Sequence, residues 1–272
     1  MQSKPCTVLI EARHLEGDLD EENVVCQLDE VNNQRIVSIG GFSKKELKDK
    51  IKSGEIISGK TTMFNDGAEV IDDEIMVDPD KTKFEKKDKP DKIARNLAGI
   101  SGTRTVLVVR VIAPDASTTQ SKATLSDEIF GTSGDVFNLK AGYKQCSANQ
   151  LFFEPTSDAR VTDLVNRPSE RGVYEVTIST AVTGVADGTI RDAVTNALAA
   201  QLGSSWSTAF THTMLCLPPG TSGGWIAYAY VNWYLSVYNN VWCSYPSADM
   251  HEIGHNLGLA HSNEGTTGKV IS

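Results

Sequence analysis

The sequence predicts a fold of the α+β class, with a mixed α/β layered domain preceded by a small β-rich segment. In residues 102–272, short apolar runs alternate with helical patterns, which is typical of a mixed sheet covered by helices. In residues 1–101, the apolar runs are short and stand between acidic stretches. The charge density changes at the same place: residues 1–101 hold 16 Lys plus Arg and 21 Asp plus Glu, whereas residues 102–272 hold 10 and 14. We therefore expect one region over residues 1–101 and a second domain over residues 102–272.

The first region is predicted to form short strands and one helix. Its apolar runs "CTVLIEA" and "QRIVSIGG" predict strands divided by acidic turns, and "SKKELKDKIKSG" predicts a short charged helix. The boundary is expected near residues 88–102, where "DKPDKIARNLAGISG" ends in small, flexible residues. The basic stretch "KTKFEKKDKPDKIAR" is interrupted by acids and by Pro90, so we expect a solvated linker there.

The second region begins with a predicted buried strand. The run "TRTVLVVRVIA" is almost continuously apolar and branched, which suits a strand covered on both faces. Helical signals follow in "LSDEIFG" and "DVFNLKAGYKQ", and "QLFFEP" and "GVYEVTIST" predict two further strands.

The clearest predicted helix is "TIRDAVTNALAAQLG". Its apolar residues recur every four positions, at Ile190, Val194, Leu198 and Leu202. Thr189 with Asp192 resembles a capping box, and Gly203 is a natural end. One strand is expected in "HTMLCLP" and one in a run within "GGWIAYAYVNWYLSVYNN", before a last helix that begins near Ser247.

The sequence excludes a membrane-spanning protein and argues against a general nucleic-acid-binding protein. With 40% apolar and 22% charged residues, the chain has no apolar run near the roughly 20 residues of a membrane span. The net charge of -9 argues against a general affinity for nucleic acid, which needs Lys and Arg clustered on one face.

The stretch "HEIGHNLGLAH" has the residue types and spacing of a zinc centre. On a helix, His251 and His255 project from one face one turn apart, and two such imidazoles can bind one Zn²⁺. Glu252 then lies beside the metal, where a base for a zinc-activated water is needed. His261 would lie about 15 Å further along a continuous helix. Gly258 allows the chain to turn back and deliver His261 as a third ligand, which leaves the fourth position open as in catalytic zinc sites.

These residues also carry a family resemblance. The stretch "HEIGHNLGLAHS" resembles the zinc signature of the metzincin metallopeptidases, and the gametolysin family is the closer match. The similarity extends upstream to "TRTVLVVRVIAPD", "FGTSGDVFNLKAGYKQCSANQLFFEP", "HTMLCLPPG" and "GGWIAYAYV", and so covers approximately residues 102–272. The resemblance implies a metzincin-like upper subdomain, with a twisted mixed sheet and an active-site helix.

The resemblance also implies a function and a set of roles. His251, His255 and His261 would be zinc ligands and Glu252 the general base of a secreted zinc endopeptidase that hydrolyses extracellular or cell-wall proteins. Residues 1–101 would be a pro-segment-like region of a zymogen. The strand within "GGWIAYAYV" would be an edge to which a peptide substrate adds. The alternative is a zinc-binding but catalytically inactive fragment, or a partner-binding protein.

The other candidate residues leave alternatives open. His14 and His212 lack ligand spacing and are expected to be ordinary, and Glu264 is a weaker third ligand than His261. A thiolate of Cys6 or Cys26 is one hypothesis for an inhibitory ligand, although no cysteine-switch motif surrounds either residue. Cys216 could pair with Cys243 in an oxidising compartment, and Cys146 is another possible partner.

Two features of secreted metzincins are not found in this sequence. The start "MQSKPCTVLIEARH" is not a secretory signal, because its apolar run of four residues is too short. Only "SNEGTTGKVIS" follows His261, without the methionine of a Met-turn, so we expect the chain to be a truncated form.

Overall fold

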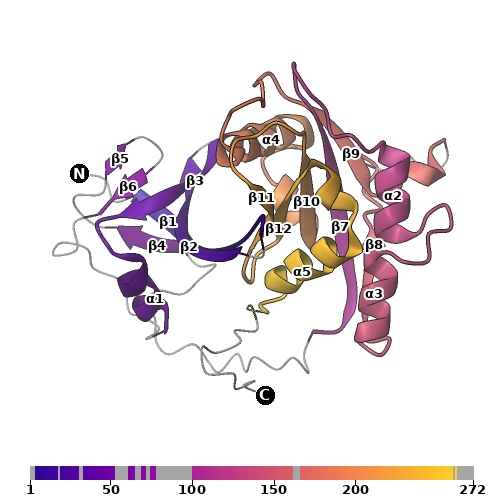
Figure 1. The fold of residues 1–272 in the computed structure, drawn as a ribbon, viewed down its shortest axis with the longest axis horizontal. Coiled ribbons are helices and arrows are strands. Elements are labelled where there is room, and N and C mark those ends of the chain that lie inside the picture. Colours follow the sequence, from indigo (N-terminus) through magenta and orange to yellow (C-terminus); the bar gives the residue numbers. More distant parts are fainter. Residues whose placement is uncertain are drawn as a thin grey trace.

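The computed structural model describes residues 4–17, 19–30, 33–52, 61–64, 69–71, 74–77, 100–161, 166–259 and 261. Across this part of the chain, twelve strands form one sheet and five α-helices pack around it (Figure 1). The predicted linker over residues 81–95 and the residue Glu264 lie outside the described residues.

The strands and helices follow the chain in this order. The strands of the first region are β1 (Lys4–Leu15), β2 (Leu19–Glu30), β3 (Asn33–Gly40), β4 (Thr61–Phe64), β5 (Glu69–Ile71) and β6 (Glu74–Met76). The later strands are β7 (Gly102–Ile112), β8 (Leu151–Pro155), β9 (Val173–Thr177), β10 (His212–Leu217), β11 (Trp225–Tyr230) and β12 (Leu235–Asn239). The helices are α1 (Lys44–Lys52), α2 (Lys122–Phe130), α3 (Leu139–Cys146), α4 (Asp187–Leu202) and α5 (Pro246–Asn256).

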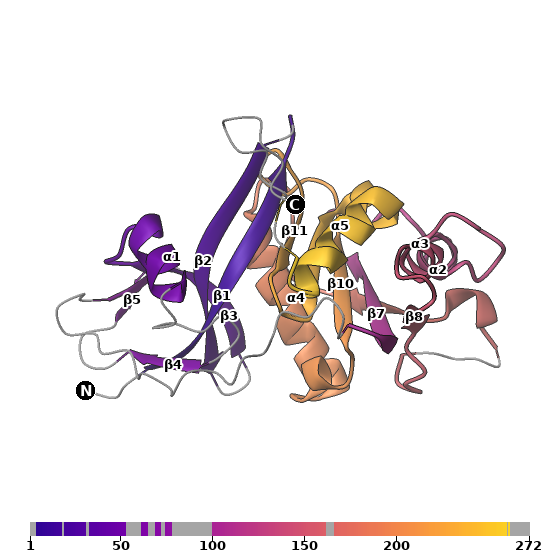
Figure 2. The ribbon, with the colours of Figure 1, turned by 90° about the horizontal axis from the view of Figure 1, so that it is seen from below.

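One continuous sheet joins the two regions. Its strand order is β5-β6-β3-β2-β1-β11-β12-β10-β7-β8, with β4 also on β1 and β9 also on β7. Strands β12, β10, β7, β8 and β9 run parallel, whereas β11 is antiparallel to β12. The regions meet where β1 pairs antiparallel with β11, at the centre of the molecule in Figure 2.

Helices cover both faces of the later half of the sheet. Alternate residues of β7 point to opposite faces, so Leu107 and Val109 pack with α4 while Val106 and Val108 pack with α2, α3 and α5. All four of these side chains are fully buried, as the apolar run predicts. A separate apolar cluster joins α1 to the strands of the first region.

Most predicted elements are confirmed, and three details are wrong. Helix α4 begins at Asp187 with Ala186 as its N-cap, so Thr189 is not a cap; the Asp187 carboxylate stabilises the helix N-terminus instead. The aromatic run forms two strands, because Asn232 turns the chain with φ of 57°. Much of the acidic stretch predicted to form turns is the long strand β2.

The cysteines form two pairs and leave one thiol. Cys216 is bonded to Cys243, which was one of the predicted alternatives, and Cys6 is bonded to Cys26. Cys146 is free and exposed. None of the described helices is both long enough and apolar enough to span a bilayer.

Candidate metal centre

The helix that carries the histidine motif is α5, and it ends in a glycine turn. Gly258 has φ of 91°. Its N–H donates to the carbonyl of His255 at 2.8 Å, and the N–H of Leu259 donates to the carbonyl of Gly254 at 2.9 Å. This pair of bonds is a Schellman motif, which reverses the chain after the helix. The turn predicted at Gly258 is therefore present, and it leads the chain back toward His251.

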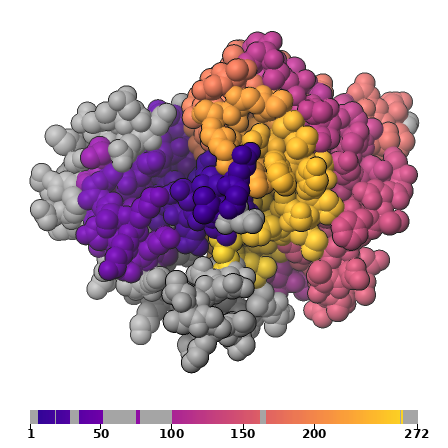
Figure 3. Space-filling model, in the orientation of Figure 1, coloured from indigo at the N-terminus to yellow at the C-terminus, as the bar shows by residue number. Residues whose placement is uncertain are grey.

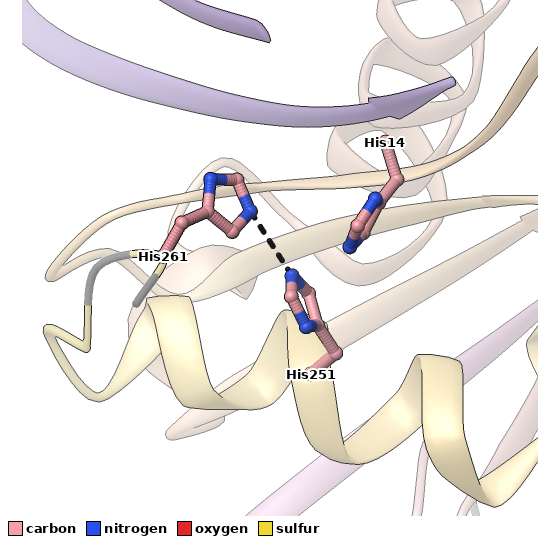
Figure 4. A group of neighbouring side chains, drawn as sticks. All are labelled: His14, His251 and His261. Carbon is pink, nitrogen blue, oxygen red and sulfur yellow. Dashed lines mark hydrogen bonds between the residues drawn. The ribbon is translucent and has the colours of Figure 1, made fainter. Parts of the chain in front are cut away.

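The three histidines of the motif converge on one point. The Nε2 atom of His255 lies 3.0 Å from Nε2 of His251 and 3.0 Å from Nε2 of His261, and the remaining Nε2 separation is 3.1 Å. Imidazole nitrogens around a tetrahedral ion at 2.0–2.1 Å are separated by about 3.3 Å. The cluster therefore has the size that one such ion requires. Figure 4 shows His251 and His261 with these nitrogens facing each other.

Glu252 is a buried carboxylate beside this cluster. Its side chain is 1% exposed, and neither of its oxygens has a hydrogen-bond partner among the described residues. Burial raises the pKa of Glu252 well above its usual range; the charge of Asp20 adds to this and that of Arg13 opposes it. Burying an acid without a hydrogen-bond partner costs free energy, and a role in binding or catalysis is one reason for such a group to be retained.

His251 and His255 are held in the neutral form that metal binding requires. Burial, followed by the neighbouring His14, His255 and His261, lowers the pKa of His251 to about 3. Burial also lowers the pKa of His255. A neutral imidazole offers a lone pair to a metal ion, so these groups need not lose a proton to bind one near neutral pH.

Hydrogen bonds orient the helix and its ligand candidates. The Nδ1 of His255 lies 2.8 Å from the carbonyl oxygen of Leu259, which directs Nε2 toward the cluster. The buried Asn256 donates from Nδ2 to the carbonyl oxygens of Tyr230, at 3.0 Å, and Leu235, at 2.9 Å. These two bonds fix α5 against β11 and β12.

The structure adds a fourth histidine, which the sequence did not indicate. Ligand atoms of His14, His251 and His261 all lie within 4.8 Å of one another, and the ring centroids of His14 and His251 are 4.1 Å apart (Figure 4). The Nδ1 of His14 lies 2.5 Å from the carboxylate of Asp20, which also lies 3.8 Å from Nδ1 of His261. The expectation that His14 is an ordinary residue is therefore not supported by its position.

Other candidates lie away from the cluster. His212 is buried on β10, where its ring lies tilted against that of Phe153 with centroids 5.5 Å apart. Cys6 and Cys26 are bonded to each other and fully buried. The hypothesis of an inhibitory thiolate from either residue is therefore wrong, because the disulfide leaves no thiolate to bind a metal.

A helix-covered mixed sheet with this helix, glycine turn and histidine cluster is typical of a metallopeptidase. The comparison with protein families agrees: a family model described as Gametolysin peptidase M11 matches residues 106–268. The chain belongs to this family, and the family's chemistry implies a metal cofactor. No curated protein and no solved structure matches the chain.

Proposed function

We propose that the chain is a zinc-dependent endopeptidase with its active site at the end of α5. The observation that supports this most directly is the convergence of three Nε2 atoms at 3.0–3.1 Å beside a buried, unpartnered carboxylate. Three imidazoles are a ligand set typical of catalytic zinc, whereas magnesium and calcium prefer oxygen ligands. His251, His255 and His261 would hold the ion.

A bound zinc ion supplies a Lewis acid that polarises the peptide carbonyl and favours deprotonation of water. Glu252 acts as the general base, because its oxygens are free of other hydrogen bonds and it lies next to a ligand in sequence. Its raised pKa suits a group that must accept a proton from water and then donate it to the leaving amine. The burial of its side chain keeps bulk water from competing for this proton.

The proposed substrate is an extended segment of an extracellular or cell-wall protein. Such a segment would add as a strand to β11, which lies next to α5 and is joined to it by the bond from Asn256 to Tyr230. Two disulfides, Cys6–Cys26 and Cys216–Cys243, support an oxidising, extracellular location.

The experiment compares Glu252→Gln, His251→Ala and wild-type protein for zinc content and for cleavage of labelled casein. Glu252→Gln is expected to retain one zinc per chain and to lose cleavage by about 100-fold or more, the usual size of a general-base effect. His251→Ala is expected to lose zinc. Glu128→Gln is the control, because Glu128 is another helical acid whose pKa is raised by burial, although it is less buried than Glu252; this variant should cleave casein normally.

Two outcomes would count against the proposal. Unchanged cleavage by Glu252→Gln would refute the role of the base. Stoichiometric zinc without cleavage, even after the first region has been released from β11, would favour a zinc-binding protein without catalysis.

A further inference from the structure

The sheet edge at which we place the substrate is already paired with a strand of the same chain. β12 pairs with one edge of β11, and β1 pairs antiparallel with the other, from Glu11 opposite Tyr230 to Leu15 opposite Trp225. A peptide that adds to a sheet edge forms the same kind of backbone pairing. Figure 3 shows the dark-blue residues at the start of the chain packed against the orange and yellow residues near its end.

Strand β1 also brings His14 to the metal centre. Successive residues of a strand point to opposite faces, so Arg13 and His14 face opposite sides of the sheet. Arg13 points toward α4, and His14 points toward α5 and the histidine cluster. The register with β11 shifts between His14 and Leu15, and irregularities of this kind re-aim side chains.

A charged network fastens β1 on the α4 side. The guanidinium of Arg13 donates to both carboxylate oxygens of Asp187, at 3.2 and 2.9 Å, and lies 4.3 Å from the ring centroid of Tyr228. Next to it, the hydroxyl of Tyr230 donates to Glu11 at 3.1 Å. This ion pair favours the observed position of β1, because displacement of the strand leaves each partly buried charge without its counter-charge.

We propose that the first region is a built-in inhibitor in which His14 occupies the fourth ligand position while β1 fills the substrate edge. This inference rests on the proposed function and states how that site is regulated. Asp20 would orient His14 through its Nδ1, in the way that carboxylates orient metal-bound imidazoles. The ligand atom of His14 already lies within 4.8 Å of those of His251 and His261, and coordination to the same ion requires these separations to fall to about 3.3 Å. Four protein ligands close a zinc site, so catalysis requires that the first region moves away.

The first test counts imidazole ligands by zinc X-ray absorption on the full chain. Wild-type protein is expected to show four imidazoles per zinc, and His14→Ala three imidazoles and one oxygen ligand. His212→Gln removes a histidine outside the cluster and is expected to keep four. His14→Gln serves as a second variant, because its side chain has a similar size and keeps the strand packing.

The second test uses acetohydroxamate, a small chelator that needs an open position on the metal. His14→Ala is expected to bind it about tenfold more tightly than wild type or better, if nine in ten wild-type molecules are closed. Casein cleavage tests the strand separately: Arg13→Glu repels Asp187 and should increase cleavage, and Arg13→Glu with Asp187→Arg should restore the low wild-type rate.

The outcomes separate this inference from the proposed function. Three imidazoles in both wild type and His14→Ala, with equal acetohydroxamate affinity, would overturn the role of His14 and leave the zinc site intact. Absence of stoichiometric zinc from wild-type protein, or its retention in His251→Ala, would overturn the proposed function itself.

Discussion

Replacing Gly258 with alanine tests the turn that returns His261 to the cluster. Gly258 has φ of 91°, where an L-residue is strained by about 1–2 kcal/mol. A Cβ at this position would also collide with the side-chain amide of Asn232, at a separation that no real Cβ contact shows. Asn232 is exposed, so the collision is relieved when its side chain rotates away, which costs about 0.5–1.5 kcal/mol. We therefore expect Gly258→Ala to lower the free energy of unfolding by about 1.5–3.5 kcal/mol.

Gly184 provides a matched control. It lies at the third position of a turn that the N–H of Val185 closes by donating to the carbonyl of Val182; its φ is 74°, but a Cβ there would meet no atom within 4 Å. Gly184→Ala therefore has the conformational cost alone, about 1–2 kcal/mol. Urea denaturation of the metal-free variants measures both values, and the difference between them isolates the collision with Asn232.

Zinc affinity provides the second readout of this variant. If the turn positions His261, Gly258→Ala should bind zinc more weakly in a chelator competition, whereas Gly184→Ala should bind it as wild type does. The double variant Gly258→Ala with Asn232→Gly should recover part of the lost stability. Equal destabilisation by the two single variants, with equal zinc affinity, would refute the reasoning.

Three further predictions concern the rest of the fold. Asn256→Ala leaves the buried carbonyls of Tyr230 and Leu235 without their donor, so we expect a loss of about 1–3 kcal/mol in urea denaturation; a loss below 0.5 kcal/mol would contradict the role of these bonds. Burial lowers the pKa of His212 to about 4 from an ordinary 6.5, so the folded state binds fewer protons than the unfolded state between these values. The contribution of buried, neutral His212 to the free energy of unfolding is complete above pH 6.5 and falls by up to about 3 kcal/mol as the pH drops to 4. Urea denaturation of His212→Gln across this range should lack that pH dependence. Native, unreduced protein should react with one equivalent of maleimide, at Cys146, and labelling of three or more thiols would contradict the two disulfides.

Sequence patterns predicted the features whose causes are local. The spacing of His251 and His255 needs only a helix, and the turn at Gly258 needs only a residue that tolerates positive φ. The buried strand β7 was equally visible, because every residue from Val106 to Val109 is apolar. The turn at Asn232 was missed, although asparagine is a residue that adopts positive φ readily and marks such turns.

Features that depend on distant pairing were not predictable in this way. His14 reaches the cluster only because β1 pairs with β11, and no local pattern in "EARHLEGD" specifies that partner. Asp20 is likewise placed by the β1–β2 pairing, in which it lies opposite His14. The acidic strand β2 contradicts the low strand propensity of Asp and Glu, because cross-strand pairing overrides that propensity.

The junction of β1 with β11 also has a consequence for folding. Glu11 and Tyr230, which are bonded across it, are 219 residues apart in sequence. Contacts between such distant segments form late, because a long loop must close before they contribute any stability. During synthesis, β1 can pair with β2 long before β11 exists. We therefore expect the sheet to be assembled from two separately folded halves, with this junction as the last step and the point most sensitive to misassembly.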